Sequence, residues 1–427
     1  MTDYFPYQIT GAEWLAARRR ALLADEPGLG KTAQAIRAAM LVRADPVLVI
    51  APASMRSGWQ NDLIKFGATG RWVVESYDVV ARRWQDFTGP WGAIVIDEAH
   101  YLKSPSILRT SAIYGAKNFP GLINMAGHVW ALTGTPTPND ASEMHTHMAA
   151  LFPESLAMAA YPKKRYSRDQ FVRRYCKTRE SEWGLKVYGS KNLDDLRARL
   201  NPHLLRRTKK EVLPDLPTIT YEPLLFDAPD ALTSLVEIPG DEAAALRDAL
   251  KDGDAASLQA LAPGLASLRR VTALAKTEIV LAWAKDFLAS TDRKLVIFGH
   301  HTAPLERIAD HFRKVFKDKS PPMILGNTRS DGRASAVRRF QEDPEARLFV
   351  GQIQAAGTGI TLTAASDLLF LEQSWVPAEN SQAAQRIHRI GQTRGCMVRY
   401  AALAGSIDEA VQRVLERKTK MVSDLFG

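Results

Sequence analysis

Cysteine is scarce in this sequence of 427 residues, and long apolar runs are missing. The two cysteines, Cys176 and Cys396, lie far apart without metal-ligand spacing, which excludes a disulfide framework or zinc cluster and is typical of free thiols in a reducing cytosol. No stretch approaches the roughly 20 apolar residues that a membrane helix needs. The opening segment carries Asp3 and Pro6 where a secretory leader would be basic and then apolar. We therefore expect a cytoplasmic protein of a prokaryotic or phage-infected cell, although the short basic stretch 163–165 leaves a nuclear location open.

Positive charge is concentrated in one part of the chain. The formal net charge is +9, and the segment Tyr161–Leu213 contains 16 Lys or Arg against 6 Asp or Glu. Such a segment is either a solvated basic surface or a track for a polyanion, because cations placed on phosphates release condensed counterions. Charge alone does not separate DNA, RNA and membrane, but no amphipathic basic helix with large apolar residues is present, so a membrane is the least favoured partner.

The spacing of apolar runs predicts an α/β fold with two similar halves. Short apolar strands alternate with helical patterns in each half, as a parallel sheet requires. The expected strands are Ala21–Ala24, Val47–Ala51, Arg71–Glu75, Ala93–Asp97 and His128–Thr133, followed in the second half by Leu295–Phe298, Met323–Leu325, Leu348–Gly351, Leu368–Leu371 and Met397–Ala401. We expect two RecA-like parallel-sheet lobes in tandem, with helical insertions.

Composition shifts between these runs predict the domain boundaries. Lobe 1 is assigned to residues 1–225, with a basic helical protrusion over about 153–202. Pro214 and Pro217 indicate a linker. Residues 226–293 are assigned to a helical protrusion and linker, and 294–427 to lobe 2. Further helices are expected at Asp241–Lys251, Ala255–Leu261 and, closing the chain, Ser406–Leu425.

The segment Ala24–Thr32 reads Ala-Asp-Glu-Pro-Gly-Leu-Gly-Lys-Thr and lies between a predicted strand and a predicted helix. This context is typical of a phosphate-binding loop, in which glycines let the backbone approach phosphate oxygens at a helix N-terminus. Lys31 would neutralise β/γ-phosphate charge, and the Thr32 hydroxyl would ligate magnesium. Asp25 departs from the common pattern, which has glycine there.

Two adjacent acids follow the apolar strand of Ala93–His100, which reads Ala-Ile-Val-Ile-Asp-Glu-Ala-His. Asp97 can hold magnesium, and Glu98 can polarise the water that attacks the γ-phosphate. His100 has no histidine partner at metal-ligand spacing, so we interpret it as a hydrogen-bonding residue between motifs. Together with the upstream loop, these acids predict an ATP hydrolase that uses Mg²⁺.

Arg386 and Arg389 stand three residues apart within Gln382–Gln392, which we interpret as helical. On a helix both guanidinium groups would share one face. Arginines so placed can reach a γ-phosphate and stabilise its transition-state charge. In isolation the same spacing also fits two surface arginines on an amphipathic helix.

Taken together, these stretches resemble the Swi/Snf-type ATPases of helicase superfamily two, the chromatin- and fork-remodeller family. Val296–His301 and the short intervals between motifs are similar to the HARP-like annealing-helicase branch, here in a minimal bacterial or phage form. The matching pieces run nearly end to end: Tyr7–Gly11, Asp25–Thr32, Ile50–Ser54 with Trp59, Asp97–His100, Leu132–Pro136, Leu204–Lys209, Gly357–Ala364, Ser374–Pro377 and Gln382–Gln392. Thr361 departs from the asparagine that is frequent at its position, which weakens any ribose contact there.

The resemblance implies an ATP-dependent translocase on double-stranded or branched DNA, gripped mainly through its phosphate backbone and working as a monomer with unknown protein partners. It implies nucleotide contacts from Gln8, which would read the adenine, and from Pro27, Gly28, Leu29, Gly30, Lys31, Thr32, Gly359 and Gln382. It also implies DNA contacts from Ser54, Lys103, Thr135, Arg207, Lys209, Thr358 and Trp375, the last of which could equally be a buried tryptophan.

Two other functions remain open from the sequence. The Asp-Glu-Ala-His tetrad also occurs in RNA helicases that separate strands. A nucleic-acid clamp that uses ATP only as a switch is the second alternative, although such a clamp can dispense with Glu98, Arg386 and Arg389. No strand-splitting pin is evident, so we expect translocation without efficient unwinding.

Overall fold

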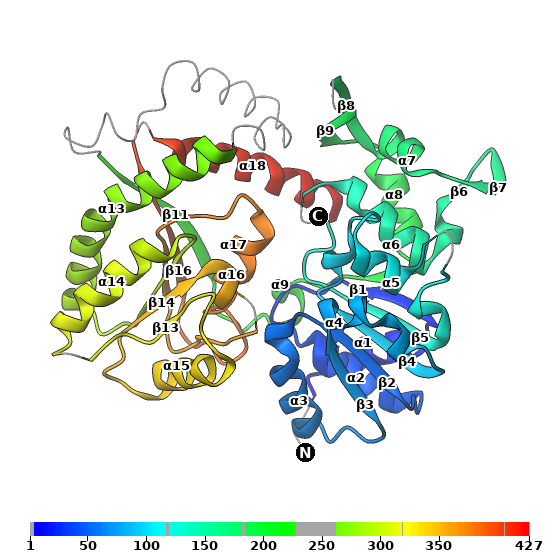
Figure 1. The fold of residues 1–427 in the computed structure, drawn as a ribbon, viewed down its shortest axis with the longest axis horizontal. Helices are drawn as coiled ribbons and strands as arrows, with labels where there is room; N and C mark the ends of the chain where they lie inside the picture. The colour runs from blue at the N-terminus through cyan, green and yellow to red at the C-terminus, as the bar shows by residue number, and fades with distance from the viewer. Residues whose placement is uncertain are drawn as a thin grey trace. The chain divides into compact units, whose positions relative to one another are not determined.

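The computed structural model describes residues 4–116, 119–137, 139–181, 184–227, 262–317, 319–357, 359–404 and 406–426. The chain divides into two compact units (Figure 1). Unit 1 comprises Met1–Arg179, Gly189–Pro214 and Met421–Gly427, and unit 2 comprises Glu180–Tyr188 and Asp215–Lys420. Each unit contains one parallel six-stranded sheet, which confirms the predicted fold class. None of the helices in the described ranges is both long and apolar enough to span a membrane.

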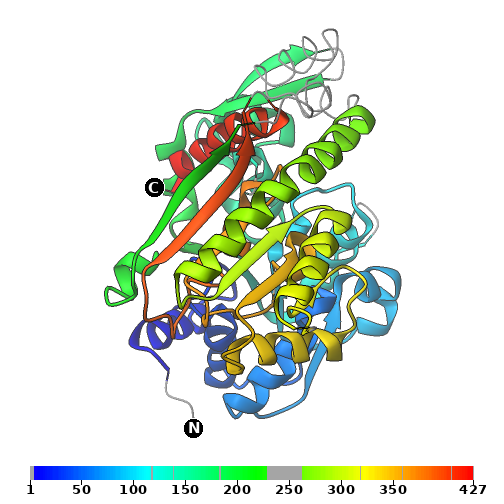
Figure 2. The ribbon, with the colours of Figure 1, turned by 90° about the vertical axis from the view of Figure 1, so that its left-hand side faces the viewer.

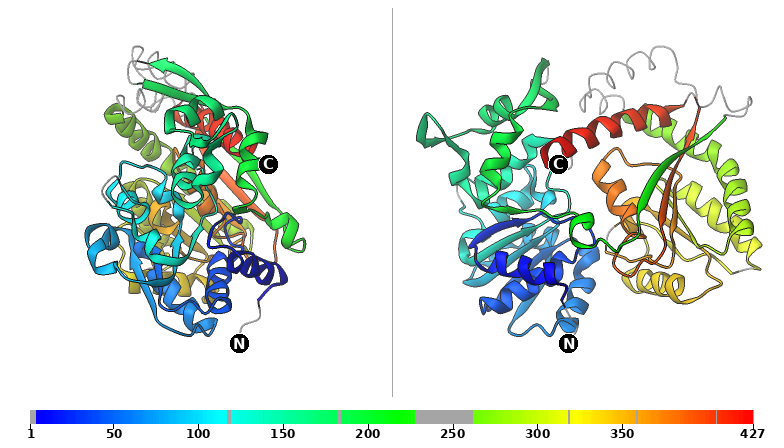
Figure 3. Two further views of the ribbon diagram at one scale, coloured as in Figure 1. Left: turned by 90° about the vertical axis from the view of Figure 1, so that its right-hand side faces the viewer. Right: turned by 180° about the vertical axis from the view of Figure 1, so that it is seen from behind.

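The sheet of unit 1 has the strand order β10-β1-β5-β4-β2-β3, and every pairing in it is parallel. Buried apolar side chains fill its strands, as expected for a parallel sheet covered on both faces. Figure 3 shows α1 and α3 lying against it. The strands are β1 (Arg20–Leu23), β2 (Val47–Ala51), β3 (Trp72–Ser76), β4 (Trp91–Asp97), β5 (Ala126–Leu132) and β10 (Leu204–Leu205).

The helices of unit 1 occupy the crossovers between these strands and the insertion after β5. They are α1 (Pro6–Ala16), α2 (Lys31–Leu41), α3 (Arg56–Lys65), α4 (Tyr77–Arg82), α5 (Leu108–Tyr114), α6 (Met144–Leu151), α7 (Arg168–Tyr175), α8 (Leu193–Leu200) and α9 (Lys209–Val212).

The basic insertion is not purely helical, so the prediction for 153–202 is wrong in part. Besides α7 and α8 it contains the strand pairs β6 (Ala157–Met158) with β7 (Tyr161–Arg165), and β8 (Cys176–Ser181) with β9 (Gly184–Ser190). The many Lys and Arg residues suggested helix because both have high helix propensity. Pairing with a neighbouring strand overrides this weak preference.

The sheet of unit 2 has the order β11-β16-β15-β12-β14-β13, again all parallel. Side chains of β12 alternate between two cores. Leu295 and Ile297 pack with α13 and α14 on one face, whereas Val296 and Phe298 pack with α15, α16 and α17 on the other. Figure 2 shows α13 and α14 crossing the first of these faces.

The elements of unit 2 match the predicted second alternation. The strands are β11 (Ile219–Phe226), β12 (Leu295–Gly299), β13 (Met323–Ile324), β14 (Leu348–Gln352), β15 (Asp367–Phe370) and β16 (Cys396–Leu403). The helices are α13 (Ala262–Ser290), α14 (Thr302–Val315), α15 (Ser330–Glu342), α16 (Ile353–Ala356), α17 (Pro377–Ala384) and α18 (Ile407–Phe426). The last part of α18, from Met421, is assigned to unit 1.

The predicted boundary at residue 225 is too late, because β11 pairs with β16 from Ile219↔Cys396 to Phe226↔Leu403. The structural division falls at Pro214, where the sequence showed its proline-rich linker. β11 was missed because Pro223 interrupts it, and proline is tolerated in a sheet only at an edge such as this. The helices predicted at Asp241–Lys251 and Ala255–Leu261 lie outside the described residues.

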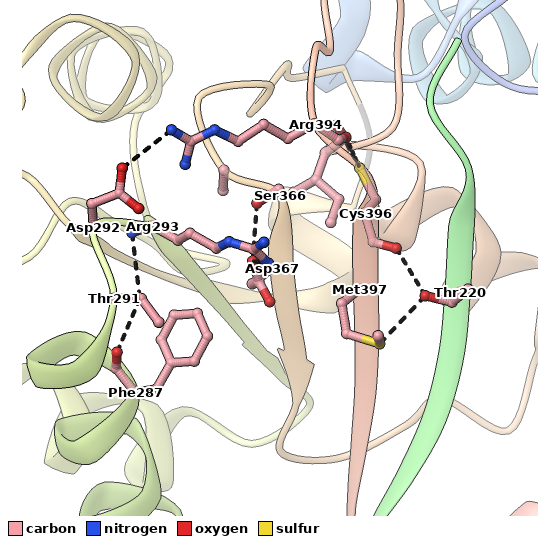
Figure 4. A network of polar contacts seen from close by, with 12 residues as sticks. Thr220, Phe287, Thr291, Asp292, Arg293, Ser366, Asp367, Arg394, Cys396 and Met397 are labelled. Carbon is pink, nitrogen blue, oxygen red and sulfur yellow. Dashed lines mark hydrogen bonds and ion pairs between the residues drawn. The ribbon is translucent and has the colours of Figure 1, made fainter.

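A polar network holds the amino-terminal ends of β15 and β16 in unit 2 (Figure 4). The buried carboxylate of Asp367 accepts hydrogen bonds from Arg293 (3.3 Å) and from the Ser366 hydroxyl (2.9 Å). Beside it, the Thr220 hydroxyl of β11 donates to the Cys396 carbonyl at 3.2 Å. These contacts fix one end of the sheet. The loops that follow β12, β14 and β15 leave from the opposite, carboxyl end.

Candidate functional site

The predicted phosphate loop connects β1 to α2, as the sequence indicated. Gly28 and Gly30 have φ values of 93° and 72°, which favour glycine, and α2 begins directly after Gly30. The Lys31 ammonium donates to the Asp25 carbonyl at 2.8 Å and to the Glu26 carbonyl at 3.4 Å. The loop therefore curls around its own lysine at the N-terminus of a helix, where backbone N–H groups favour an anion.

Gln8 of α1 lies against this loop. Its side-chain amide donates to the Leu29 carbonyl at 3.3 Å and accepts from the Phe5 N–H at 3.1 Å. A Cβ atom at Gly30 would lie 2.4 Å from Gln8 Nε2, so this close approach also requires glycine. Gln8 is brought to the nucleotide loop as predicted, and its contact with adenine stays a prediction.

Arg207, for which the sequence predicted a DNA contact, pairs with the phosphate loop in this structure, and its contact with DNA stays a prediction. Its guanidinium forms two hydrogen bonds with the fully buried carboxylate of Asp25, at 3.0 and 2.6 Å, and donates to Gln34 Oε1 at 2.7 Å. Gln34 in turn donates to Asp25 at 3.0 Å. A buried carboxylate needs such a partner, which explains how the loop accommodates aspartate where glycine is common.

The strand pairing of β10 with β1 places this arginine beside the loop. Leu22 and Leu23 pair with Leu204 and Leu205, and the hydrogen bonding continues beyond the strands from the Glu26 N–H to the Arg207 carbonyl at 3.0 Å. Residues 206–209 therefore run alongside 24–27. Gly11 makes room for the pair, because its Cβ would lie 1.9 Å from Gln34 Oε1.

Lys209 belongs to the same segment and is buried, at 5% exposure. Its backbone N–H donates to the Glu26 carboxylate at 2.7 Å. The Lys209 segment is thus anchored to the phosphate loop, and a DNA contact of Lys209 stays a prediction.

The two acids lie at the end of β4, as predicted. Asp97 accepts a 2.7 Å hydrogen bond from the indole N–H of Trp59, and its carbonyl accepts one of 2.6 Å from the Tyr77 hydroxyl. Burial and the neighbouring Glu98 carboxylate raise the pKa of Asp97 to about 6, although the Trp59 hydrogen bond and the Lys31 charge oppose this. Sequence reasoning gave no role to Trp59 or Tyr77, because their contacts cross between elements.

Glu98 adopts a left-handed backbone conformation, with φ 51° and ψ 51°. This region is unfavourable for a residue with a side chain, and such strain concentrates at functional sites. His100 Nδ1 lies 3.3 Å from the Glu98 carboxylate and 3.1 Å from the Thr133 hydroxyl. His100 thus connects two motifs, as predicted, and among the described residues no cluster of three or more metal-ligating side chains occurs.

The remaining DNA contacts predicted for unit 1 have different surroundings. Ser54 is exposed on the 3₁₀ turn Ala53–Met55, just beyond β2. Lys103 forms a 2.8 Å ion pair with Glu143 while its side chain stays one-third exposed. Thr135 donates its N–H to the Thr133 hydroxyl at 3.1 Å. DNA binding by these three residues stays a prediction.

Arg386 and Arg389 lie in turns beyond α17, which ends at Ala384, so the helix predicted through them is wrong. The two side chains still converge, because both donate to the Ile360 carbonyl, at 3.2 and 3.0 Å. Arg389 also donates to the Thr361 hydroxyl at 3.1 Å. The threonine that departs from the family pattern thus provides an acceptor for this arginine.

Further contacts fix this segment of unit 2. The buried Gln392 amide donates to the carbonyls of Thr363, Ala365 and Ile387, at 3.2, 2.8 and 2.8 Å. Gln382 is also buried, and its carbonyl accepts from Arg386 Nε at 3.0 Å. Gly359 is exposed, with φ 74°. Thr358 lies outside the described residues.

A second buried carboxylate lies just beyond β15. Glu372 accepts hydrogen bonds from the His301 ring (2.7 Å) and from the backbone N–H groups of His300 (3.1 Å) and His301 (2.9 Å). Although burial raises the pKa of Glu372, these bonds and the nearby Lys276 charge lower it to about 2. Sequence reasoning used the two histidines for the resemblance alone and missed this pairing.

Trp375 is half-buried near this carboxylate and has a cation beside its ring. The Arg269 guanidinium lies 5.4 Å from the ring centroid. The tryptophan is thus neither fully buried nor fully exposed, and its contact with DNA stays a prediction.

Comparison with family models identifies both halves of the chain. Residues 7–71 and 64–227 match the SNF2-related domain, and residues 276–391 match the helicase conserved C-terminal domain. The chain belongs to the SNF2 family of helicase-like ATPases. This confirms the resemblance inferred from the motifs, and DNA-dependent ATP hydrolysis is the family activity.

This SNF2 chain is similar in sequence to two kinds of curated relatives. It is 31% identical, over 99% of its length, to the SWI/SNF-related matrix-associated actin-dependent regulator of chromatin subfamily A-like protein 1 of Xenopus tropicalis. It is 30% identical, over its full length, to the mouse DNA annealing helicase and endonuclease ZRANB3. The chain covers only 45% and 41% of these two proteins.

Among solved structures, the chain is similar to the Sulfolobus solfataricus SWI2/SNF2 ATPase core in complex with dsDNA. The identity is 23% and the TM-score 0.44, with 99% of this chain and 93% of that one covered. The core domain of the same protein without DNA gives 22% identity and the same TM-score, with 100% and 91% covered.

Proposed function

We propose that this SNF2 chain is a Mg²⁺-dependent ATPase that translocates along double-stranded DNA, including branched DNA, as a monomer in the cytoplasm. The observation that carries the proposal is the arrangement in unit 1. There the phosphate loop with Lys31 lies at the carboxyl end of β1, and the acids Asp97 and Glu98 with the bridging His100 lie at the carboxyl end of β4, the two parallel strands that flank β5. Ligands of open α/β sheets bind at this edge.

The residues of unit 1 fit a magnesium nucleotide. The loop glycines with positive φ leave backbone N–H groups open to phosphate oxygens. Thr32 and Asp97 offer the hard oxygen ligands that Mg²⁺ prefers. The bound cation would neutralise charge on the β- and γ-phosphates. Trp59 holds the Asp97 carboxylate in a fixed orientation, and His100 positions Glu98 to polarise an attacking water.

Arg386 and Arg389 of unit 2 would supply positive charge to the γ-phosphate. Their shared contact with the Ile360 carbonyl holds both guanidiniums close together. An arginine in this role contributes about 10³–10⁵ in kcat in other nucleotide hydrolases. Opening and closing of the units with ATP binding and release would then move the DNA.

The test is ATP turnover without nucleic acid and with linear duplex DNA, forked DNA or duplex RNA. We expect stimulation by DNA, and displacement of a triplex-forming strand that requires ATP. Lys31→Ala and Glu98→Gln should each abolish turnover, the second with ATP binding retained. Failure of every DNA to stimulate turnover would overturn the proposal, and preferential stimulation by duplex RNA would favour the helicase alternative.

A further inference from the structure

The β6–β7 hairpin of unit 1 presents an unusual concentration of exposed cations. All five residues of β7, Tyr161–Arg165, are exposed, and three in succession are basic: Lys163, Lys164 and Arg165. Tyr161 is 61% exposed, and the Lys164 ammonium lies 5.1 Å from its ring centroid. The hairpin projects away from the sheet of unit 1 (Figures 1 and 3).

Nothing in the fold accounts for these side chains. In the described part of the chain, no carboxylate forms an ion pair with Lys163, Lys164 or Arg165. Adjacent like charges repel one another, and a two-stranded hairpin exposed on both faces adds little stability.

The base of the hairpin, in contrast, is firmly held. Tyr166 follows β7 directly, and its N–H donates to the Leu156 carbonyl at 2.9 Å. The guanidiniums of Arg174 and Arg199 each lie 5.5 Å from the Tyr166 ring centroid. Asp195 fixes both arginines, at 2.9 and 3.2 Å. The exposed tip therefore has a defined origin on the protein, as an element that positions a ligand requires.

We propose that the β6–β7 hairpin, residues 157–166, is a second DNA-binding element that recognises unpaired bases at a branch point. Lys163, Lys164 and Arg165 bind backbone phosphates, and Tyr161 stacks on an unpaired base. Aromatic rings interleaved with cations are the combination that binds single-stranded nucleic acid, because every base offers a π-face. The inference rests on the proposed function, and it adds a preference for branched over linear DNA.

The first test compares binding of the full chain to a fork and to a linear duplex of matched sequence, by fluorescence anisotropy at several salt concentrations. The triple variant Lys163→Ala/Lys164→Ala/Arg165→Ala should bind the fork at least about 10-fold more weakly, with a salt slope smaller by up to about 3. The control variant Lys285→Ala/Lys314→Ala/Lys317→Ala removes three exposed charges from unit 2 and should retain affinity. Equal losses in both variants would overturn the proposal.

The second test measures the contribution of the Tyr161 ring alone. Tyr161→Ala should weaken fork binding by about 5- to 100-fold, the range of one stacked base, and leave linear-duplex affinity unchanged, whereas Tyr161→Phe should bind normally. A fluorescent base analogue at the branch should be quenched by the wild type and not by Tyr161→Ala. Equal weakening on both DNAs, or unchanged quenching, would overturn the stacking role.

A separate measurement distinguishes this inference from the proposed function. At saturating linear duplex, ATP turnover of every hairpin variant should equal that of the wild type, because the hairpin lies outside the ATP site. If the wild type itself is not stimulated by DNA, the proposed function fails whatever the hairpin binds. If stimulation is normal and fork preference is unaffected by all hairpin variants, only the hairpin inference fails.

Discussion

In each unit a buried carboxylate fixes a loop just beyond a parallel strand, Asp25 in unit 1 and Glu372 in unit 2, and the two are held by different chemistry. Asp25 of unit 1 pairs with Arg207, which is permanently charged. Glu372 of unit 2 pairs with the His301 ring and two backbone N–H groups. The loop beside the nucleotide site is thus fixed by a guanidinium, whereas the loop of unit 2 is fixed by an imidazole ring and two backbone N–H groups.

The difference shows what each carboxylate does for its loop. Asp25 joins three segments, since Arg207 and Gln34 both reach it. Glu372 joins the end of β15 to the turn before α14, where His301 is the N-cap residue. We therefore expect a large loss of stability on breaking the first pair, and a smaller loss on breaking the second, which depends on pH through the lowered pKa of Glu372.

Arg207→Ala should produce the largest loss of stability, because it leaves the fully buried Asp25 carboxylate without its cation. Removing one partner of a buried ion pair costs about 3–5 kcal/mol, measurable as a lower urea midpoint. The double variant Asp25→Gly/Arg207→Ala, which restores the common glycine, should recover most of the loss. A small effect for Arg207→Ala with a large loss of DNA affinity would instead return this arginine to the DNA surface.

The same pair shows where sequence reasoning is sufficient and where it ends. The phosphate loop and the acids after β4 were predicted from contiguous residues, because a strand, a loop and a helix N-terminus form locally. The partner of Asp25 is 182 residues away and becomes adjacent only when β10 pairs with β1. Its sequence signal was the buried aspartate itself, which required a cation that the local sequence does not provide.

Arg386 and Arg389 of unit 2 illustrate a second limit of structure prediction from the sequence. The spacing of Arg386 and Arg389 predicted a helix through both residues, but long-range contacts end α17 before them. The Arg386 carbonyl accepts from the Leu362 N–H, and the Ile387 carbonyl accepts from Gln392. Since these carbonyls are bound elsewhere, helical hydrogen bonding does not continue. Pairing with a neighbouring strand likewise formed the two hairpins of the basic insertion and the edge strand β11, none of which the sequence analysis predicted.

His301→Ala should produce an intermediate and pH-dependent effect. The folded-state pKa of Glu372 is about 2, below its ordinary value near 4.5. A depressed pKa contributes stability that is fully present above the ordinary value and is lost as the pH falls from about 4.5 to 2. Without the His301 ring the variant should be less stable at pH 6 by about 2–3 kcal/mol, and the difference should shrink towards pH 3. Urea unfolding at pH 6, 4.5 and 3 measures this.

A matched control for that series is His311→Ala, because His311 is exposed in the same helix. Its stability should follow the wild type at every pH. A difference between His301→Ala and wild type that stays constant from pH 6 to 3 would mean that the ring contributes packing alone.

Gln352→Met should produce the smallest loss of stability. It separates the effect of the Glu372–His301 pair from that of the turn around it. The Gln352 amide donates to the His300 carbonyl at 2.8 Å and accepts from the Gly326 N–H at 3.0 Å, so it supports the same turn without touching Glu372. Methionine keeps the length of the side chain and removes both hydrogen bonds, at a cost of about 1–2 kcal/mol. Because neither partner titrates, the cost should be equal at pH 6 and pH 3 in urea unfolding. A cost that shrinks with acid, as expected for His301→Ala, would show that the whole turn, rather than the Glu372–His301 pair, responds to pH.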